Sequence, residues 1–262
     1  MPMADFDLTF KLTKAAFGLL LLLLMKAFMN WSGGKDSSLC LYYTQQQGIP
    51  VEALLTSVNS AHDRISMHGV RRELLRQQAA AIKLPLHTLE LPEQPGMATY
   101  ETILHITHHS LQQQGFTHAV YGDIFLEDLK TYRVSQLAKE GLEAVFPLWE
   151  RNTKVLMQEF LALGFKAIVV CVNDQFLDQS FCGRLIDEAF MASLPANVDV
   201  CGENGEFHSF VFDGPFFTKP VLFEKGEIIY RHYAAPKEEE TECFTDAKPK
   251  AGFYFCDLLP LT

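Results

Sequence analysis

The chain has 262 residues, of which 48% are hydrophobic and 21% are charged, and its formal net charge is −10. This composition is ordinary for a globular protein, and the length suits one large α/β domain or two small ones with a full core. The acidic balance, without a block of basic residues, disfavours a nucleic acid as the main partner, because such binding depends on a basic surface.

The N-terminal stretch, residues 1–24, ends in a run of leucines. Its apolar part is about half of the roughly 20 residues that a membrane-spanning helix requires. It has the length of a signal-peptide core, but Asp5 and Asp7 dilute the basic flank and no small-residue cleavage site follows. We expect residues 1–24 to be an extension ahead of a cytoplasmic protein that folds from Met25 and has no membrane partner. A retained anchor and a signal peptide are the alternatives.

From Met25 onwards, strand-like and helix-like segments alternate. Strands of this kind, separated by helices of 10–15 residues, predict βαβ units and a doubly wound parallel sheet. The predicted strands are 26–31, 51–58, 86–91, 117–124 and 166–172, and the predicted helices are 36–48, 69–82, 98–114, one that ends near 139–141, and 153–163.

After about residue 193 the alternation of strand-like and helix-like segments ends. Short alternating stretches at 206–214, 220–226 and 227–235 are separated by turn residues, which favours an antiparallel hairpin region. The charge run at 237–242 is typical of a solvated loop or tail. Counting elements, we expect a first domain at 25–135, a smaller α/β domain at 136–235 and a tail at 236–262.

Between the first strand and the first helix lies Ser-Gly-Gly-Lys-Asp-Ser, residues 32–37. Glycines let backbone N–H groups approach phosphate oxygens, and a helix N-terminus adds partial positive charge. Serine hydroxyls can donate hydrogen bonds, a lysine can pair with a phosphate, and an aspartate beside an anion suits a bound Mg²⁺. The candidate phosphate and metal residues are Ser32, Gly33, Gly34, Lys35, Asp36, Ser37 and Ser38, with Asp36 as the metal ligand.

The loop lacks the G-x-x-x-x-G-K-[ST] spacing of a Walker A motif. It resembles the S-G-G-x-D-S PP-loop of the ATP pyrophosphatase superfamily, which implies a fold of the adenine-nucleotide alpha-hydrolase type. The resemblance also implies cleavage of ATP between its α and β phosphates. A chance turn followed by a helix cap is the alternative, and the position between a strand and a helix favours the nucleotide site.

Further segments narrow this resemblance to the diphthine–ammonia ligase family. They follow the family's order and read SMHG at 66–69, YGDI at 121–124, YRV at 132–134, FPLW at 146–149 and CGENGEFHSFVFDGP at 201–215. The last segment departs from the family's Glu-Gly-Gly-Glu-[Phe/Tyr]-Glu-Thr, since Asn204 replaces a glycine and His208 replaces the later glutamate. This variant resembles the bacterial branch. Because bacteria lack diphthamide, the resemblance implies the ATP chemistry more firmly than the substrate.

Several residues outside the loop are candidates for binding. Backbone groups at Val58, where the second strand ends, lie where a doubly wound sheet places an adenine, and His68 could contact the nucleotide or simply start a helix. At the end of the fourth strand, Gly122 and Asp123 could meet the substrate or Mg²⁺, although Asp123 could equally cap a turn.

The glycine-rich segment near residue 203 is the second candidate site. Glu203 and Glu206, three residues apart, could face one pocket and hold an amine, a cationic substrate or a metal, or they could be solvated acids in a turn. We count both as catalytic with Lys35 and Asp36, and add Asn204 and His208 as substrate residues, His208 being either a general base or structural.

The resemblance implies an ATP-dependent ligase that adenylates a carboxylate, releases pyrophosphate and transfers ammonia or an amine, giving AMP. The acceptor would be a small molecule or a modified protein side chain. A tRNA-modifying ligase, which would need two cysteines near the loop, and a nucleotide-binding protein without turnover are the alternatives. The oligomeric state stays open, with a homodimer as one option. The cysteines, which form no Cys-x-x-Cys, are typical of reduced buried thiols: Cys40, Cys171, Cys182, Cys201, Cys243 and Cys256.

Overall fold

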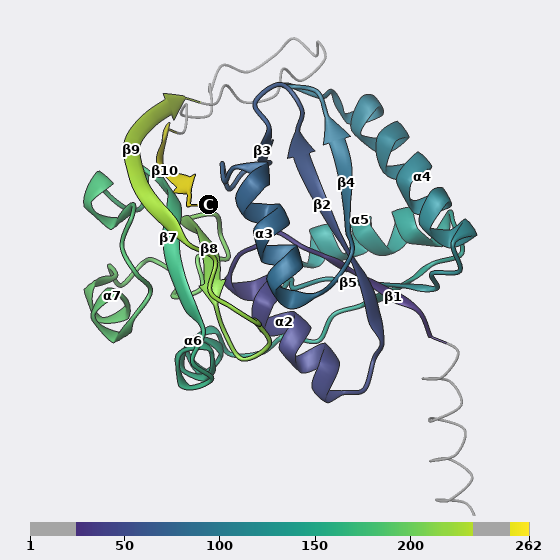
Figure 1. The fold of residues 1–262 in the computed structure, drawn as a ribbon, viewed down its shortest axis with the longest axis horizontal. Coiled ribbons are helices and arrows are strands. Elements are labelled where there is room, and N and C mark those ends of the chain that lie inside the picture. Colours follow the sequence, from purple (N-terminus) through teal and green to yellow (C-terminus); the bar gives the residue numbers. More distant parts are fainter. Residues whose placement is uncertain (1–24, 233–251, 262) are drawn as a thin grey trace, which may run out of the picture.

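The computed structural model of the protein describes residues 25–232 and 252–261 (Figure 1). The expected extension at 1–24 and the charge run at 237–242 lie outside these residues. Within the described part, no helix is long and apolar enough to span a lipid bilayer. The strands form two sheets, a mainly parallel one built early in the chain and an antiparallel one built late.

The first sheet is the predicted doubly wound parallel sheet. Its parallel strands lie side by side in the order β4 (Leu86–Leu91), β2 (Val51–Asn59), β1 (Ala27–Asn30), β5 (His118–Val120) and β6 (Glu143–Val145). The short β3 (Arg64–Ile65) pairs antiparallel with the end of β2. From β1 the chain adds β2 and then β4 on one side of the sheet. It then crosses to the other side of β1 and adds β5 and β6. The strand order therefore reverses between β1 and β5, and the carboxyl ends of these strands are where such folds bind ligands.

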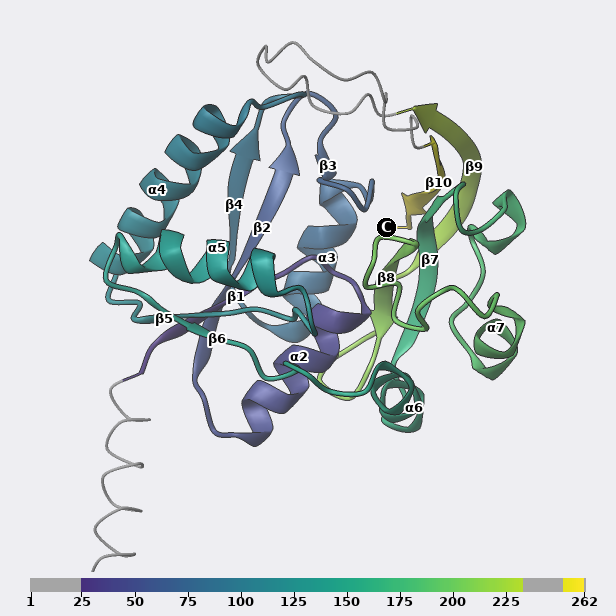
Figure 2. The ribbon, with the colours of Figure 1, turned by 180° about the vertical axis from the view of Figure 1, so that it is seen from behind.

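Helices cover both faces of this sheet, as Figures 1 and 2 show from opposite sides. Alternate side chains of β1 enter different cores: Met29 packs with α2 (Lys35–Gln46) and α3 (Arg72–Ile82), and Phe28 packs with α4 (Met97–Gln113) and α5 (Glu127–Ala138). Burial on both faces explains why β1 is apolar from Ala27 to Met29. The helix predicted at 69–82 begins only at Arg72, because Gly69 is left-handed and Arg71 is extended.

The second sheet corrects two expectations. Its order is β8 (Phe207–Asp213), β7 (Lys166–Asn173), β10 (Gly252–Pro260) and β9 (Phe223–His232), with antiparallel pairs throughout. The apolar strand β7 thus belongs here and not to the parallel sheet, and β10, which we expected in a tail, is a central strand. The stretches predicted at 220–226 and 227–235 contribute to one strand, β9, which pairs with β10 and not with β8.

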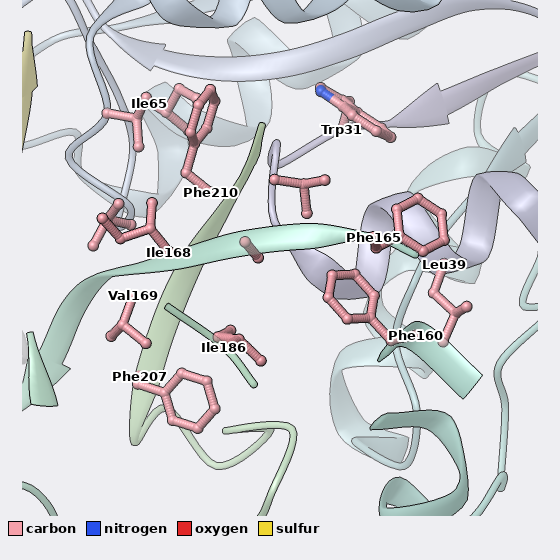
Figure 3. Close-up of a cluster of buried hydrophobic side chains, with 14 of the residues drawn as sticks. Trp31, Leu39, Ile65, Phe160, Phe165, Ile168, Val169, Ile186, Phe207 and Phe210 are labelled. Atoms are coloured by element: carbon pink, nitrogen blue, oxygen red, sulfur yellow. The ribbon is translucent and has the colours of Figure 1, made fainter. Parts of the chain in front are cut away.

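One hydrophobic cluster joins the two sheets. Trp31 and Leu39, from the start of the chain, share it with Phe165, Ile168 and Phe210 of the later segments (Figure 3). The helices α6 (Thr153–Ala162) and α7 (Glu188–Ser193) and the short 3-10 helix η1 (Gln179–Phe181) flank the second sheet. Because the core is continuous, strand β8 is held against the loop that follows β1.

Candidate active site

A cleft of about 700 Å³ opens at the carboxyl end of β1, where the strand order reverses. Pockets of roughly 300–1,000 Å³ are typical of small-molecule sites. Both halves of the chain contribute polar side chains to its wall: Ser32, Lys35, Asp36, Ser57, Asn59, His68, Asp123, Arg133, Glu203, His208 and Ser209. The phosphate loop and the segment near residue 203, which the sequence analysis treated as two candidate sites, thus line one cleft.

The serines of the loop have different roles. Ser32 lines the cleft. The hydroxyls of Ser37 and Ser38 instead donate to the carbonyl oxygen of Gly34, at 3.0 and 2.9 Å. The prediction that these two side chains hold phosphate is therefore corrected, since they brace the first turn of α2. What remains for an anion is the Ser32 hydroxyl, the Lys35 ammonium and the N–H groups that the first turn of a helix leaves unpaired.

Lys35 and Asp36 form an ion pair at the mouth of the loop. The Lys35 side chain is only 4% exposed, and its Nζ lies 2.8 and 2.6 Å from the two carboxylate oxygens of Asp36. Burial lowers the pKa of Lys35, but the charge of Asp36 and its hydrogen bond to the ammonium act against this, so the pKa is raised and the side chain is cationic. Asp36 is one-third exposed and faces the cleft, which leaves its carboxylate accessible to a metal ion.

Two further acids face the same cleft. Asp123 pairs with Arg133 at 2.8 Å, yet burial raises its pKa against the effect of that arginine. Glu203 accepts a hydrogen bond from the N–H of Ile124 at 3.0 Å, and burial, followed by the charge of Asp36, raises its pKa to about 7. Burial, followed by the charge of Asp36, thus raises the pKa of both carboxyl groups, and acids gathered in this way favour a cationic ligand.

A magnesium ion fits this donor set only if a ligand supplies part of its coordination. Among residues 25–232 and 252–261, no three His, Cys, Asp or Glu side chains are grouped closely enough to hold a metal ion alone. Mg²⁺ in nucleotide sites is usually held by one or two carboxylates together with phosphate oxygens. The accessible Asp36, with Asp123 across the cleft, matches that arrangement.

The expected pairing of Glu203 with Glu206 is not present. Glu206 is fully buried, and its carboxylate accepts hydrogen bonds from the N–H of Asp199 at 3.0 Å, the N–H of Asn204 at 2.9 Å and the Asn204 side chain at 3.0 Å. The carboxylate therefore holds together the turn that presents Glu203. Glu206 and the exposed Asn204 are joined to each other within this turn, and neither is among the residues that line the cleft.

Glu206→Gln should consequently destabilise the fold. The amide would place an NH₂ group against backbone donors that now reach a carboxylate oxygen, and a buried donor left unpaired costs about 1–3 kcal/mol. We expect a loss of about 2 kcal/mol in the free energy of unfolding, measured by urea denaturation. Glu227→Gln, which makes the same change at an exposed position on β9, is the matched control. An unchanged denaturation midpoint for Glu206→Gln would contradict the structural role.

Two histidines, one from each half of the chain, line the cleft beside the loop. The rings of His68 and His208 lie 4.7 Å apart, and Nδ1 of His68 donates to the carbonyl oxygen of Ser209 at 3.0 Å. Burial lowers the pKa of His68 to about 4, and burial, His68 and Lys35 lower that of His208 well below its ordinary value. Both imidazoles are therefore neutral and can accept a proton or a hydrogen bond.

The remaining candidates lie near the cleft without lining it. Val58 is in the core and is flanked by β3 on one edge and β4 on the other, whereas its neighbours Ser57 and Asn59 line the cleft. A side chain at Gly122 would come within 3.1 Å of the Asp36 backbone, so this glycine allows close packing on α2. Neither is placed to contact a ligand through its side chain.

Three residues that sequence reasoning did not select belong to the site. Arg133 and Ser209 line the cleft, and both lie within segments that carried the family resemblance, which was the available signal. Gln78, in the middle of a predicted amphipathic helix, carried no signal at all. Its side-chain amide donates a hydrogen bond to the carbonyl oxygen of Gly33 in the phosphate loop.

The cysteines do not assemble a pair at the loop. Cys201 is close enough to Lys35 to affect its pKa, whereas Cys171 and Cys182 lie together in the second sheet region. All five cysteines in the described ranges are free and buried, and burial raises the pKa of each. Of Cys171, Cys182 and Cys201, only Cys201 thus has an interaction with a loop residue.

Comparison with known proteins gives matches over most of the chain. The family model described as Diphthamide synthase N-terminal domain matches residues 25–142, and that of the Diphthamide synthase C-terminal domain matches residues 152–235. A diphthine–ammonia ligase of Bos taurus is 32% identical over 110 residues, which are 40% of this chain and 41% of that protein. One of Danio rerio is 25% identical, covering 76% of this chain and 86% of its own.

The matched regions differ in extent between relatives. A diphthine–ammonia ligase of Schizosaccharomyces pombe is 24% identical over 78% of this chain, but the match spans only 37% of that longer protein. Among solved structures, a chain described as a predicted subunit of tRNA methyltransferase from Methanocaldococcus jannaschii is 15% identical, with a TM-score of 0.40, over 73% of this chain and 98% of its own. Matches to both domain models, in order and over the whole cleft, show that this chain belongs to the diphthamide synthase family of diphthine–ammonia ligases.

Proposed function

We propose that the protein is an ATP-dependent ligase that joins a carboxylate to ammonia or another amine, with AMP and pyrophosphate as products. The observation that carries this proposal is the cleft itself. The cationic Lys35, the PP-loop, two neutral histidines beside it and Glu203, a carboxylate with a raised pKa, line the same cleft. The names of the relatives support a carboxylate of a modified protein side chain as acceptor, and a small carboxylate is the alternative.

The loop would act in the first step. A carboxylate does not react with amines because its oxygen is a poor leaving group, and attack on the α-phosphate of ATP converts it into an acyl-adenylate with release of pyrophosphate. Ser32, the first-turn N–H groups of α2 and Lys35 are placed to stabilise the charge that develops on the pyrophosphate. Mg²⁺, when held by Asp36 and Asp123 with the phosphates, would supply further charge neutralisation.

Glu203 and His208 would act in the second step. Ammonium or an alkylammonium must lose a proton before its nitrogen can attack the acyl carbon. An ionised Glu203, whose pKa is raised to about 7, can hold the cation and accept its proton, and the neutral His208 in the same cleft can accept a hydrogen bond from it. The amine then displaces AMP, which leaves with the electron pair of the cleaved acyl–oxygen bond. Arg133, paired with Asp123, adds positive charge for an acidic acceptor.

The test is the stoichiometry of the products. With ATP, Mg²⁺, ammonium and a panel of carboxylates that includes diphthine-bearing protein, we expect AMP and pyrophosphate in equal amounts, together with one amide per AMP. Release of ADP and phosphate, or nucleotide binding without turnover on any acceptor, would contradict the proposal. Turnover only with added tRNA would favour the RNA-modifying alternative.

A further inference from the structure

Gln78 on α3 is fully buried, yet every polar group of its side chain has a partner. Its Oε1 accepts a hydrogen bond from Nε1 of Trp31 at 2.7 Å. Its Nε2 donates to the carbonyl oxygen of Gly33 at 3.0 Å and to that of Val211 at 2.6 Å. A side-chain amide has two N–H groups, so both are used. One residue thus connects the end of β1, the phosphate loop and strand β8.

The carbonyl of Gly33 is held from two directions. Besides Gln78, the N–H of Val211 donates to it at 2.9 Å. Gly33 has a φ of +77°, and a Cβ at this position would lie 2.9 Å from Oε1 of Gln78. The loop therefore passes over Gln78 at a distance that only glycine allows, in a conformation that glycine adopts most easily.

The orientation of one peptide group follows from this contact. In a planar trans peptide the C=O and N–H bonds point in opposite directions. Because the oxygen of Gly33 points at Gln78 and Val211, the N–H of Gly34 points away from them and donates a hydrogen bond at 3.2 Å to the Oγ of Ser32, which lines the cleft. If this peptide flipped, a carbonyl oxygen would face the anion site and repel phosphate oxygens.

We propose that Gln78 is a positioning residue that keeps the Gly33–Gly34 peptide in its anion-binding orientation and couples the phosphate loop to β8. Gln78 acts through the backbone and does not touch the nucleotide. Its assignment to ATP binding rests on the proposed function, whereas its effect on the loop does not. The same strand, β8, fixes the next residue too, since the N–H of Lys35 donates to Oγ of Ser209 at 3.1 Å.

Two substitutions separate the parts of this contact. Gln78→Met keeps the length of the side chain and removes the acceptor and both donors. Gln78→Glu keeps an acceptor for Trp31 but loses both donors and sets a carboxylate against two carbonyl oxygens. Gln77→Met, next in the chain but bonded only to Glu73 on the outside of α3, is the matched control.

The loop should respond in both variants. We expect amide hydrogen exchange over residues 32–38 of the whole, nucleotide-free protein to rise about tenfold or more in Gln78→Met and Gln78→Glu, with β10 unchanged. The Kd for a non-hydrolysable ATP analogue, measured by calorimetry, should rise by a similar factor. Gln77→Met should match the wild type in both measurements.

The outcomes separate this inference from the proposed function. Unchanged loop exchange in the Gln78 variants, or a response to Gln78→Met without one to Gln78→Glu, would overturn the role of the amide donors. If Gln78→Met does not fold, the isosteric Gln78→Glu decides. If the wild type bound no ATP analogue, the proposed function would fail, and the exchange measurement would still decide whether Gln78 positions the loop.

Discussion

Replacing Lys35 by methionine is expected to lower the rate of AMP formation by about two to three orders of magnitude, the usual effect of losing one preorganised group that stabilises transition-state charge. The Lys35 ammonium lies at the start of α2, in the cleft, and the neighbouring Asp36 keeps it charged despite its burial. Methionine has a similar length and fills the same buried space, but it cannot balance the charge that develops on pyrophosphate. The ATP-analogue Kd should change less than the rate, because the charge to be stabilised grows during the reaction.

The control for this experiment is Lys154→Met, which removes the same charge from the exposed start of α6. It should leave the rate of AMP formation within about twofold of the wild type, since surface charges far from the cleft contribute little. Thermal unfolding of both variants separates a folding defect from a catalytic one. A Lys35→Met protein that is folded and retains full turnover would show that this lysine does not act on the phosphates.

The parallel sheet and the phosphate loop were predictable because their signals are local. A strand buried on both faces is apolar along its length, as in β1, and the loop is a short contiguous motif in a fixed place between a strand and a helix. The position of Glu203 in the cleft also followed from a contiguous segment. In each case the residues that make the feature are neighbours in the chain, so the pattern could be read without knowing the fold.

The rest depends on contacts between distant segments. Nothing local distinguishes β7, an apolar strand after a helix, from the parallel strands before it, and its partners β8 and β10 come 34 or more positions later. Likewise, spacing placed Glu206 beside Glu203, but only the tertiary fold turns its carboxylate to the backbone of Asp199. A carboxylate that serves the ligand and one that braces a turn have the same sequence signature.

Glu203→Gln is expected to change how stability depends on pH. Burial, and next the charge of Asp36, raises the pKa of Glu203 to about 7 in the folded protein, above its ordinary value. The folded state therefore binds this proton more tightly than the unfolded state does. The resulting stabilisation is fully present below the ordinary pKa of a glutamate and is lost as the pH rises through about 7. Glutamine, which does not titrate, lacks this loss.

The measurement is the free energy of unfolding from urea titrations of both proteins at pH 4.5 and pH 8, without nucleotide or magnesium. The value for Glu203→Gln minus that for the wild type should increase by about 2 kcal/mol between these conditions. In an Asp36→Asn background the increase should be smaller, because Asp36 is one cause of the raised pKa. A difference that is independent of pH would mean that Glu203 titrates alike in the folded and unfolded states.

The same titration should appear in the activity. If the ionised Glu203 holds the amine, kcat/KM of the wild type for ammonium should rise with pH through about 7, the pKa of this carboxyl. Glu203→Gln should be about a hundredfold less active at pH 8 and should lack that rise. The glutamine can still accept the hydrogen bond from Ile124, so the wall of the cleft should keep its shape. Equal losses at pH 5.5 and pH 8 would instead show that Glu203 contributes through shape or hydrogen bonding, and that its charge is not what binds the amine.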